Sequence, residues 1–176
     1  MIFIVLIISI AVVVISYFFF NYKKNESLNK EKITLIQGKE KENEEIKKVV
    51  IPLELQAYER LTLFLDRMNP NNLVLRCYEP NMDTKLLKDV MIKNIRDEFD
   101  YNISQQIYVS SQLWAMITSA KEEMINTINI VYNNKGESIT PTGFAGALFE
   151  HFAGKNNPLE MALEVLKQES KKRFLQ

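Results

Sequence analysis

Three polar side chains share one face of a predicted helix near the middle of the chain. Glu98, Asn102 and Gln105 follow one another at intervals of four and three residues, which places them in one row on a helix. A carboxylate beside two amides could act as a general acid or base, or could bind a small polar ligand. Arg60, on an earlier predicted helix, is the natural counter-charge if the two helices pack together. These four residues are therefore candidates for a polar network or pocket.

The same face runs into a neutral segment, residues 101–120, which has no charged side chain although 25% of the chain is charged. Three interpretations stay open: a buried hydrogen-bonded seam, a protein contact surface and a ligand pocket. We favour the seam, because burying amides and hydroxyls costs less free energy than burying charges. Contact surfaces, however, are also depleted of charge and enriched in aromatic residues. The interaction candidates are Tyr101, Asn102, Gln105, Tyr108 and Trp114.

The other reactive residue types are too few for the common catalytic sites. The chain has one histidine and one cysteine, so the usual zinc ligands cannot assemble within one chain. His151, between two phenylalanines, is more typical of a structural histidine than of a general base. Cys77 could have a lowered pKa beside Arg76, but a cysteine without a companion is more typically a packed side chain. Because glycine-rich phosphate motifs are also missing, we expect no catalytic residue, no metal and no cofactor.

The first 22 residues contain no charged side chain and predict a transmembrane anchor, residues 1–22. As a helix they would extend for roughly 33 Å, enough to cross a bilayer core. No Lys or Arg precedes this segment and it ends in aromatic residues, which argues against a cleaved signal peptide. Lysines follow it, so the positive-inside rule places the N-terminus outside and the rest in the cytoplasm. The expected location is the bacterial inner (cytoplasmic) membrane, crossed once.

Residues 23–50 predict a charged juxtamembrane spacer. Between residues 23 and 48 there are eight Lys and six Glu, and this mixture of signs is typical of a solvated segment rather than a basic binding patch. Gly38 is expected to weaken or break any helix there. The remainder of the chain carries 14 basic and 16 acidic residues, so nucleic acid is not an expected partner. The expected partners are the lipid bilayer and another protein or a second copy of the chain.

Residues 51–176 predict an all-α cytoplasmic domain, a bundle of five or six helices. The predicted helix starts, each marked by a cap or a proline, are Pro52, Asp83, Ser110 or Ser111, Thr140 and Asn157. The helix after Asp83 is expected to reach Tyr108, with an apolar stripe that ends in Ile103 and Ile107. The next helix is expected to end at a glycine cap near Gly136. Residues 72–78 fit either a short helical turn or an extended link.

Three segments are similar to a known family: PLELQAYERLTLFLDRMNPNNLVLR at 52–76, IRDEFDYNISQQIYVSSQLWAMITSAKEE at 95–123 and NPLEMALEVLKQESKK at 157–172. With the anchor, they resemble an uncharacterised family of small bacterial single-pass membrane proteins that have a helical cytoplasmic domain. The resemblance implies an anchor and a helical domain, and it implies no activity or catalytic residues.

Two functions follow as hypotheses from these observations. The first is a non-enzymatic, membrane-tethered adaptor on the cytoplasmic face, because the chain combines a neutral aromatic region with a charged spacer and no catalytic motif. The alternative is a membrane-anchored enzyme or small-ligand sensor, with a polar pocket around Arg60, Glu98, Asn102 and Gln105. We expect the first of these.

Overall fold

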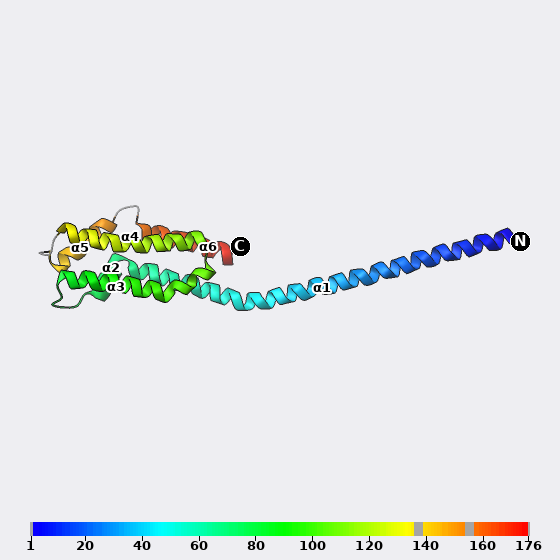
Figure 1. Ribbon diagram of the computed structural model, residues 1–176, viewed down its shortest axis with the longest axis horizontal. Helices are drawn as coiled ribbons and strands as arrows, with labels where there is room; N and C mark the ends of the chain where they lie inside the picture. The colour runs from blue at the N-terminus through cyan, green and yellow to red at the C-terminus, as the bar shows by residue number, and fades with distance from the viewer. Residues whose placement is uncertain (1, 136–138, 154–156, 176) are drawn as a thin grey trace. The chain divides into compact units, whose positions relative to one another are not determined.

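The regular structure of the described residues is entirely helical (Figure 1). A computed structural model describes residues 2–135, 139–153 and 157–175, and side chains within these ranges except at 2–14, 25, 27–31, 33 and 135. The elements are α1 (Ile2–Met68), α2 (Pro70–Cys77), α3 (Thr84–Asn102), the 3₁₀ helix η1 (Ile103–Tyr108), α4 (Ser111–Lys135), α5 (Pro141–Phe152) and α6 (Pro158–Phe174). The predicted all-α class is therefore confirmed, and residues 72–78 are resolved as helical up to Cys77.

The chain forms two compact units, Met1–Val50 and Ile51–Gln176. Helix α1 contributes its first part to one unit and its last part, residues 51–68, to the other. Two expected interruptions of α1 are wrong, since neither Gly38 nor Pro52 ends or begins it. A single glycine costs a helix only about 1 kcal/mol. Pro52 removes one backbone hydrogen bond, but it is exposed, so water can reach the carbonyl that loses its donor.

The predicted membrane anchor lies mostly outside the described side chains, which begin at residue 15. Among the residues that were described, no helix has an apolar stretch of the length needed to cross a membrane. The anchor therefore stays a prediction from the sequence.

Local capping signals correctly mark where the later helices begin. The Asp83 side chain accepts a hydrogen bond from the Leu86 backbone N–H at 2.7 Å. Ser110, rather than Ser111, caps α4 by accepting from the Leu113 N–H at 3.1 Å. Thr140 and Asn157 cap α5 and α6 in the same way. The expected glycine cap near Gly136 lies outside the described residues.

The predicted long helix after Asp83 is wrong over its last six residues, because α3 ends at Asn102 and η1 follows. Asn102 donates its side-chain amide to the Glu98 backbone carbonyl at 2.8 Å. The N–H of Ile103 bonds to Asp100, three residues back, which is the 3₁₀ pattern. An asparagine that supplies a donor to the carbonyl four residues back competes with the helical backbone bond. The α-helix consequently tightens at this residue.

One core joins the helices of the second unit. Helix α4 packs against α6, α3 and α5, while α2 packs against α3 and α5. The last part of α1 joins this core through Phe64, whose ring centroid lies 5.8 Å from that of Phe99 on α3. The Phe99 ring in turn stacks on Trp114 of α4 at 5.3 Å. These ring contacts connect the last part of α1 to α3 and α4.

Candidate functional site

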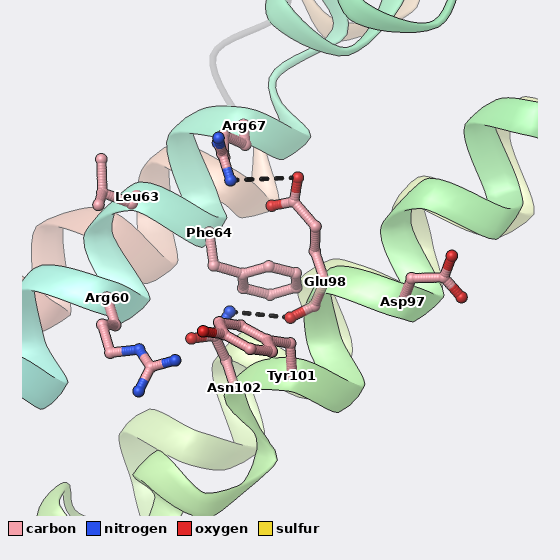
Figure 2. A pocket seen from close by; sticks show the side chains of 8 residues that line it. All are labelled: Arg60, Leu63, Phe64, Arg67, Asp97, Glu98, Tyr101 and Asn102. Carbon is pink, nitrogen blue, oxygen red and sulfur yellow. Dashed lines mark hydrogen bonds and ion pairs between the residues drawn. The ribbon is translucent and has the colours of Figure 1, made fainter.

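An open groove of about 360 Å³ lies between the last part of α1 and the C-terminal half of α3. Its lining residues are Arg60, Leu63, Phe64, Arg67, Asp97, Glu98, Tyr101 and Asn102. Figure 2 shows the Phe64 ring between the two helices, whereas Leu63 and Asp97 extend away from the facing helix. Five of the eight lining residues carry a charge or an amide, so the placement of these groups decides what the groove can bind.

Glu98 is held by arginines from two other helices. Its Oε1 atom lies 2.5 Å from Nη1 of Arg76 on α2 and 3.5 Å from Nη1 of Arg67 on α1. Arg76 also donates to the side-chain oxygen of Asn94 at 2.5 Å. The Glu98 side chain is mostly buried, with 20% of its surface exposed. This arrangement ties α1, α2 and α3 together, and a proton-transfer role for Glu98 would first require these contacts to break.

The predicted pairing of Arg60 with Glu98 is wrong. The Arg60 guanidinium carbon instead lies 4.8 Å from the centroid of the Tyr101 ring, in a cation–π contact. Within the described part of the chain, no carboxylate lies within ion-pair distance of Arg60. The Glu98 carboxylate is already in contact with Arg76 and Arg67. The sequence did not indicate that Arg76, which lies on α2, would reach Glu98.

The two buried amides of the neutral segment have different surroundings. Asn102 lines the groove and is 7% exposed. Gln105 is 6% exposed, does not line the groove, and donates to the Ser104 hydroxyl at 3.1 Å. Every fully buried side-chain nitrogen or oxygen among the described residues has a hydrogen-bond partner. The groove thus gathers Arg60, Glu98 and Asn102 from the predicted set and leaves Gln105 out.

The aromatic interaction candidates divide between surface and core. Tyr101 is 75% exposed. Tyr108 is half-buried, and Trp114 is half-buried with its ring stacked on Phe99. Sequence reasoning missed Ile107, which it assigned to a buried stripe but which is 74% exposed, as well as Ile103 at 46%. After Asn102 the helix is tighter, so the side chains no longer follow the α-helical stripe. The exposure of Ile103 and Ile107 could have been predicted only from this change of helix type.

Neither of the two lone reactive residues forms a site. Cys77 is buried, and burial raises the pKa of its thiol, outweighing the opposite influence of Arg76. The lowered pKa that Arg76 suggested is therefore wrong, and Cys77 is a packed side chain. His151 is exposed, with its ring edge-on to that of Phe152. In the described ranges no three His, Cys, Asp or Glu residues lie close enough to hold a metal ion.

A second polar cluster, which sequence reasoning missed, surrounds the Glu169 carboxylate of α6. One of its oxygens accepts from the Tyr58 hydroxyl and from the Ser110 backbone N–H, both at 2.9 Å. The other accepts from the Ser110 hydroxyl. One turn further along α6, Arg173 donates two hydrogen bonds to Glu54, at 2.8 and 2.9 Å. Because its members are 59 and 111 residues from Glu169, no local pattern could have predicted this cluster.

The buried Tyr58 hydroxyl should make the stability of the protein depend on alkaline pH. Burial, followed by the hydrogen bond to Glu169, raises the pKa of Tyr58 well above its ordinary value of 10.0. The folded state therefore favours the neutral phenol, and this stabilisation is complete below pH 10 and is lost as the pH rises above it. We expect the unfolding free energy of wild type to exceed that of Tyr58→Phe at pH 8, and this difference to shrink above pH 10. Urea denaturation at several pH values measures it, and a difference that grows with pH would contradict the assignment.

The second unit is a helical bundle with an arginine-lined surface groove and, in its described part, no recognisable catalytic arrangement. Residues 1–173 match the model of the Family of unknown function (DUF7935), and the chain belongs to this family. The expectation of an uncharacterised family is thereby confirmed. Neither the curated proteins nor the solved structures compared with the chain contain a match.

Proposed function

We propose that the chain is a non-enzymatic interaction module, tethered to the cytoplasmic face of a bacterial inner membrane and contacting a partner protein through the surface beside the groove. The observation that carries the proposal is the exposure of four large apolar side chains, one on α1 and three where α3 passes into η1. They are Leu63 of α1, and Tyr101, Ile103 and Ile107 of the α3–η1 junction. We call these four residues the junction surface.

The junction surface has the composition of a contact surface. Leu63 and Tyr101 line the same groove, whereas Ile103 and Ile107 lie in η1, the helix that follows Tyr101, and do not line it. No charged residue occurs from residue 101 to 120. Exposed apolar side chains that occur singly need no explanation, but several within one short segment and the groove next to it in sequence favour a binding role. Burying the Ile107 side chain against a partner would contribute about 1.5–3 kcal/mol.

The tether rests on residues 1–22, whose lack of charge would let them occupy a bilayer. Within the described part of this segment, Tyr17, Phe18, Phe19 and Phe20 each expose about two-thirds of their surface. A run of exposed aromatic rings is unfavourable in water and suits the headgroup region of a membrane. Lysines on the C-terminal side support the cytoplasmic placement of the second unit.

Ile107→Asp tests the proposed surface. We expect this substitution to reduce partner recovery at least tenfold, because a charge would be buried at the contact; tenfold corresponds to about 1.4 kcal/mol. The measurement is cross-linking followed by purification of the 176-residue chain in mild detergent. Since Ile107 is 74% exposed, the thermal midpoint should hardly change.

Leu86→Asp is the matched control, because Leu86 is 50% exposed at the opposite end of α3. It should leave partner recovery unchanged. A wild-type chain that elutes as a lone monomer and cross-links to nothing would contradict the proposed function. Equal losses in both variants would contradict the proposed surface.

A ligand sensor or enzyme is the second candidate, since the groove does bring Arg60, Glu98 and Asn102 together. The engagement of Glu98 by two arginines weighs against it. A metabolite that binds the groove, present at 100 times its Kd, would stabilise the chain by about 2.7 kcal/mol. Thermal-shift screening of metabolites would reveal this, with Glu98→Gln as the variant that should lose the response.

A further inference from the structure

We propose that the groove between α1 and α3 binds a carboxylate joined to an apolar group, as found on an acidic segment of a partner protein, with Arg60 as the main contact. This inference rests on the proposed function and names the chemistry that the partner presents. It is carried by the position of the Arg60 guanidinium within the groove.

Arg60 presents hydrogen-bond donors that no carboxylate of the described residues uses. Its guanidinium lies against the face of the Tyr101 ring, 4.8 Å from the ring centroid. A cation–π contact supplies no acceptor oxygen to the guanidinium, so its N–H groups stay available as hydrogen-bond donors. Two parallel N–H groups on this edge match the two oxygens of a carboxylate. The ring also fixes the guanidinium in place, which lowers the entropy lost on binding.

The charges around the groove favour an anion with a single charge. Asp97 pairs with Lys93, and Glu98 pairs with Arg76 and Arg67. After these pairings Arg60 is left over, and the Arg67 side chain is still 55% exposed with only a 3.5 Å contact to Glu98. The lining itself carries two positive and two negative groups, and counting Arg76 and Lys93 beside it gives four positive groups against two carboxylates. Two carboxylates nevertheless line the groove and would repel a dianion such as phosphate more strongly than a monoanion.

The walls of the groove favour an apolar neighbour to that carboxylate. Tyr101 and Leu63, which are 75% and 60% exposed, supply the accessible apolar surface of the lining, whereas Phe64, 1% exposed, is packed between the helices (Figure 2). A volume of about 360 Å³ is at the lower end for ligand pockets and suits one or two side chains. In Figure 2 Arg60 and Arg67 extend from the same side of α1, so an acidic segment lying along this face could meet both.

Phenylacetate is a suitable probe, because it joins one carboxylate to one ring. In the 176-residue chain, held in detergent micelles and labelled with ¹⁵N-arginine, we expect phenylacetate to shift the Arg60 Nε–H resonance saturably with a millimolar Kd. Phenylacetamide, which has the same shape and no charge, should not shift it. Inorganic phosphate should bind at least threefold more weakly than phenylacetate. An equal response to phosphate would replace the proposal with a general anion site.

Arg60→Met is expected to weaken phenylacetate binding at least tenfold, read from the Arg67 Nε–H resonance. Arg96→Met is the matched control, because Arg96 is an exposed arginine of α3 that does not line the groove. It should change the Kd by less than twofold. A wild-type chain with no saturable shift, an equal shift with phenylacetamide, or an unchanged Kd in Arg60→Met would each overturn the proposal.

Partner recovery separates this inference from the proposed function. Suppose that wild type recovers a partner, that Arg60→Met recovers it equally well, and that phenylacetate does not bind. The carboxylate site is then wrong, while the interaction module stands. If phenylacetate binds as expected but the chain recovers no partner, the site stands and the proposed function fails. The full expectation is that Arg60→Met reduces both probe binding and partner recovery, whereas Arg96→Met reduces neither.

Discussion

Replacing Phe64 with alanine is expected to lower the unfolding free energy by about 3–5 kcal/mol. Phe64 is 1% exposed, and its ring lies 5.8 Å from that of Phe99. Because Phe99 in turn stacks on Trp114, the removed ring belongs to the chain of ring contacts that runs from α1 through α3 to α4. The backbone of three helices cannot close the resulting cavity without disturbing other contacts, so the cost includes a cavity contribution as well as lost burial. Urea denaturation of the 176-residue chain, followed by circular dichroism, measures the change.

Leu63→Ala is the matched control for this prediction. Leu63 is the preceding residue of the same helix, but it is 60% exposed. Its removal should change the unfolding free energy by no more than about 0.5 kcal/mol. If Phe64→Ala and Leu63→Ala destabilised the protein equally, the placement of α1 against α3 would be wrong, and with it the groove.

Glu169→Ala is expected to destabilise the protein by about 2–3 kcal/mol. The substitution removes the acceptor for three hydrogen bonds, from the Tyr58 hydroxyl, the Ser110 N–H and the Ser110 hydroxyl. Tyr58 is only 5% exposed, so its hydroxyl would be left without a partner and with little access to water. Leaving a buried donor unsatisfied costs more than the net contribution of the bond itself. The loss would loosen α6 from α1 and from the start of α4.

Glu164→Ala on the same helix provides the comparison for Glu169→Ala. Glu164 is exposed and accepts one hydrogen bond, from Gln168 one turn away, so its removal should cost no more than about 0.5 kcal/mol. The double variant of Glu169→Ala with Tyr58→Phe should be less destabilised than the sum of the two single variants, because both remove the same bond. Strict additivity would show that the Tyr58–Glu169 bond contributes nothing to stability.

The helix starts could be predicted because each depends on residues that are close in the sequence. Asp83 bonds to the N–H of Leu86, and Asn157 to that of Leu159, three and two residues away. Gly38 and Pro52 were misjudged because propensity alone does not show whether a helix is exposed to water or packed against a neighbour.

The candidate site could be predicted only in part. Glu98 and Asn102 share a helix face, and this followed from their spacing. The partner of Glu98 did not, because Arg76 comes from α2, a helix of eight residues that the sequence left open between a turn and an extended link. The exposure of Ile103 and Ile107 could not be predicted from the sequence either. It depends on the hydrogen bond from the Asn102 side-chain amide to the Glu98 carbonyl, where the α-helix ends.

The sequence by itself determined the all-α class, the capped helix starts and the neutral segment from 101 to 120. These depend on backbone hydrogen bonds within a turn and on hydrophobic periodicity, which act over a few residues. Only the tertiary structure decided that Arg76 rather than Arg60 pairs with Glu98, that Glu169 joins α6 to α1, and that Tyr101 and Ile107 face solvent. Those outcomes depend on which side chains meet when separate helices pack, and a charged group pairs with the partner that packing brings closest.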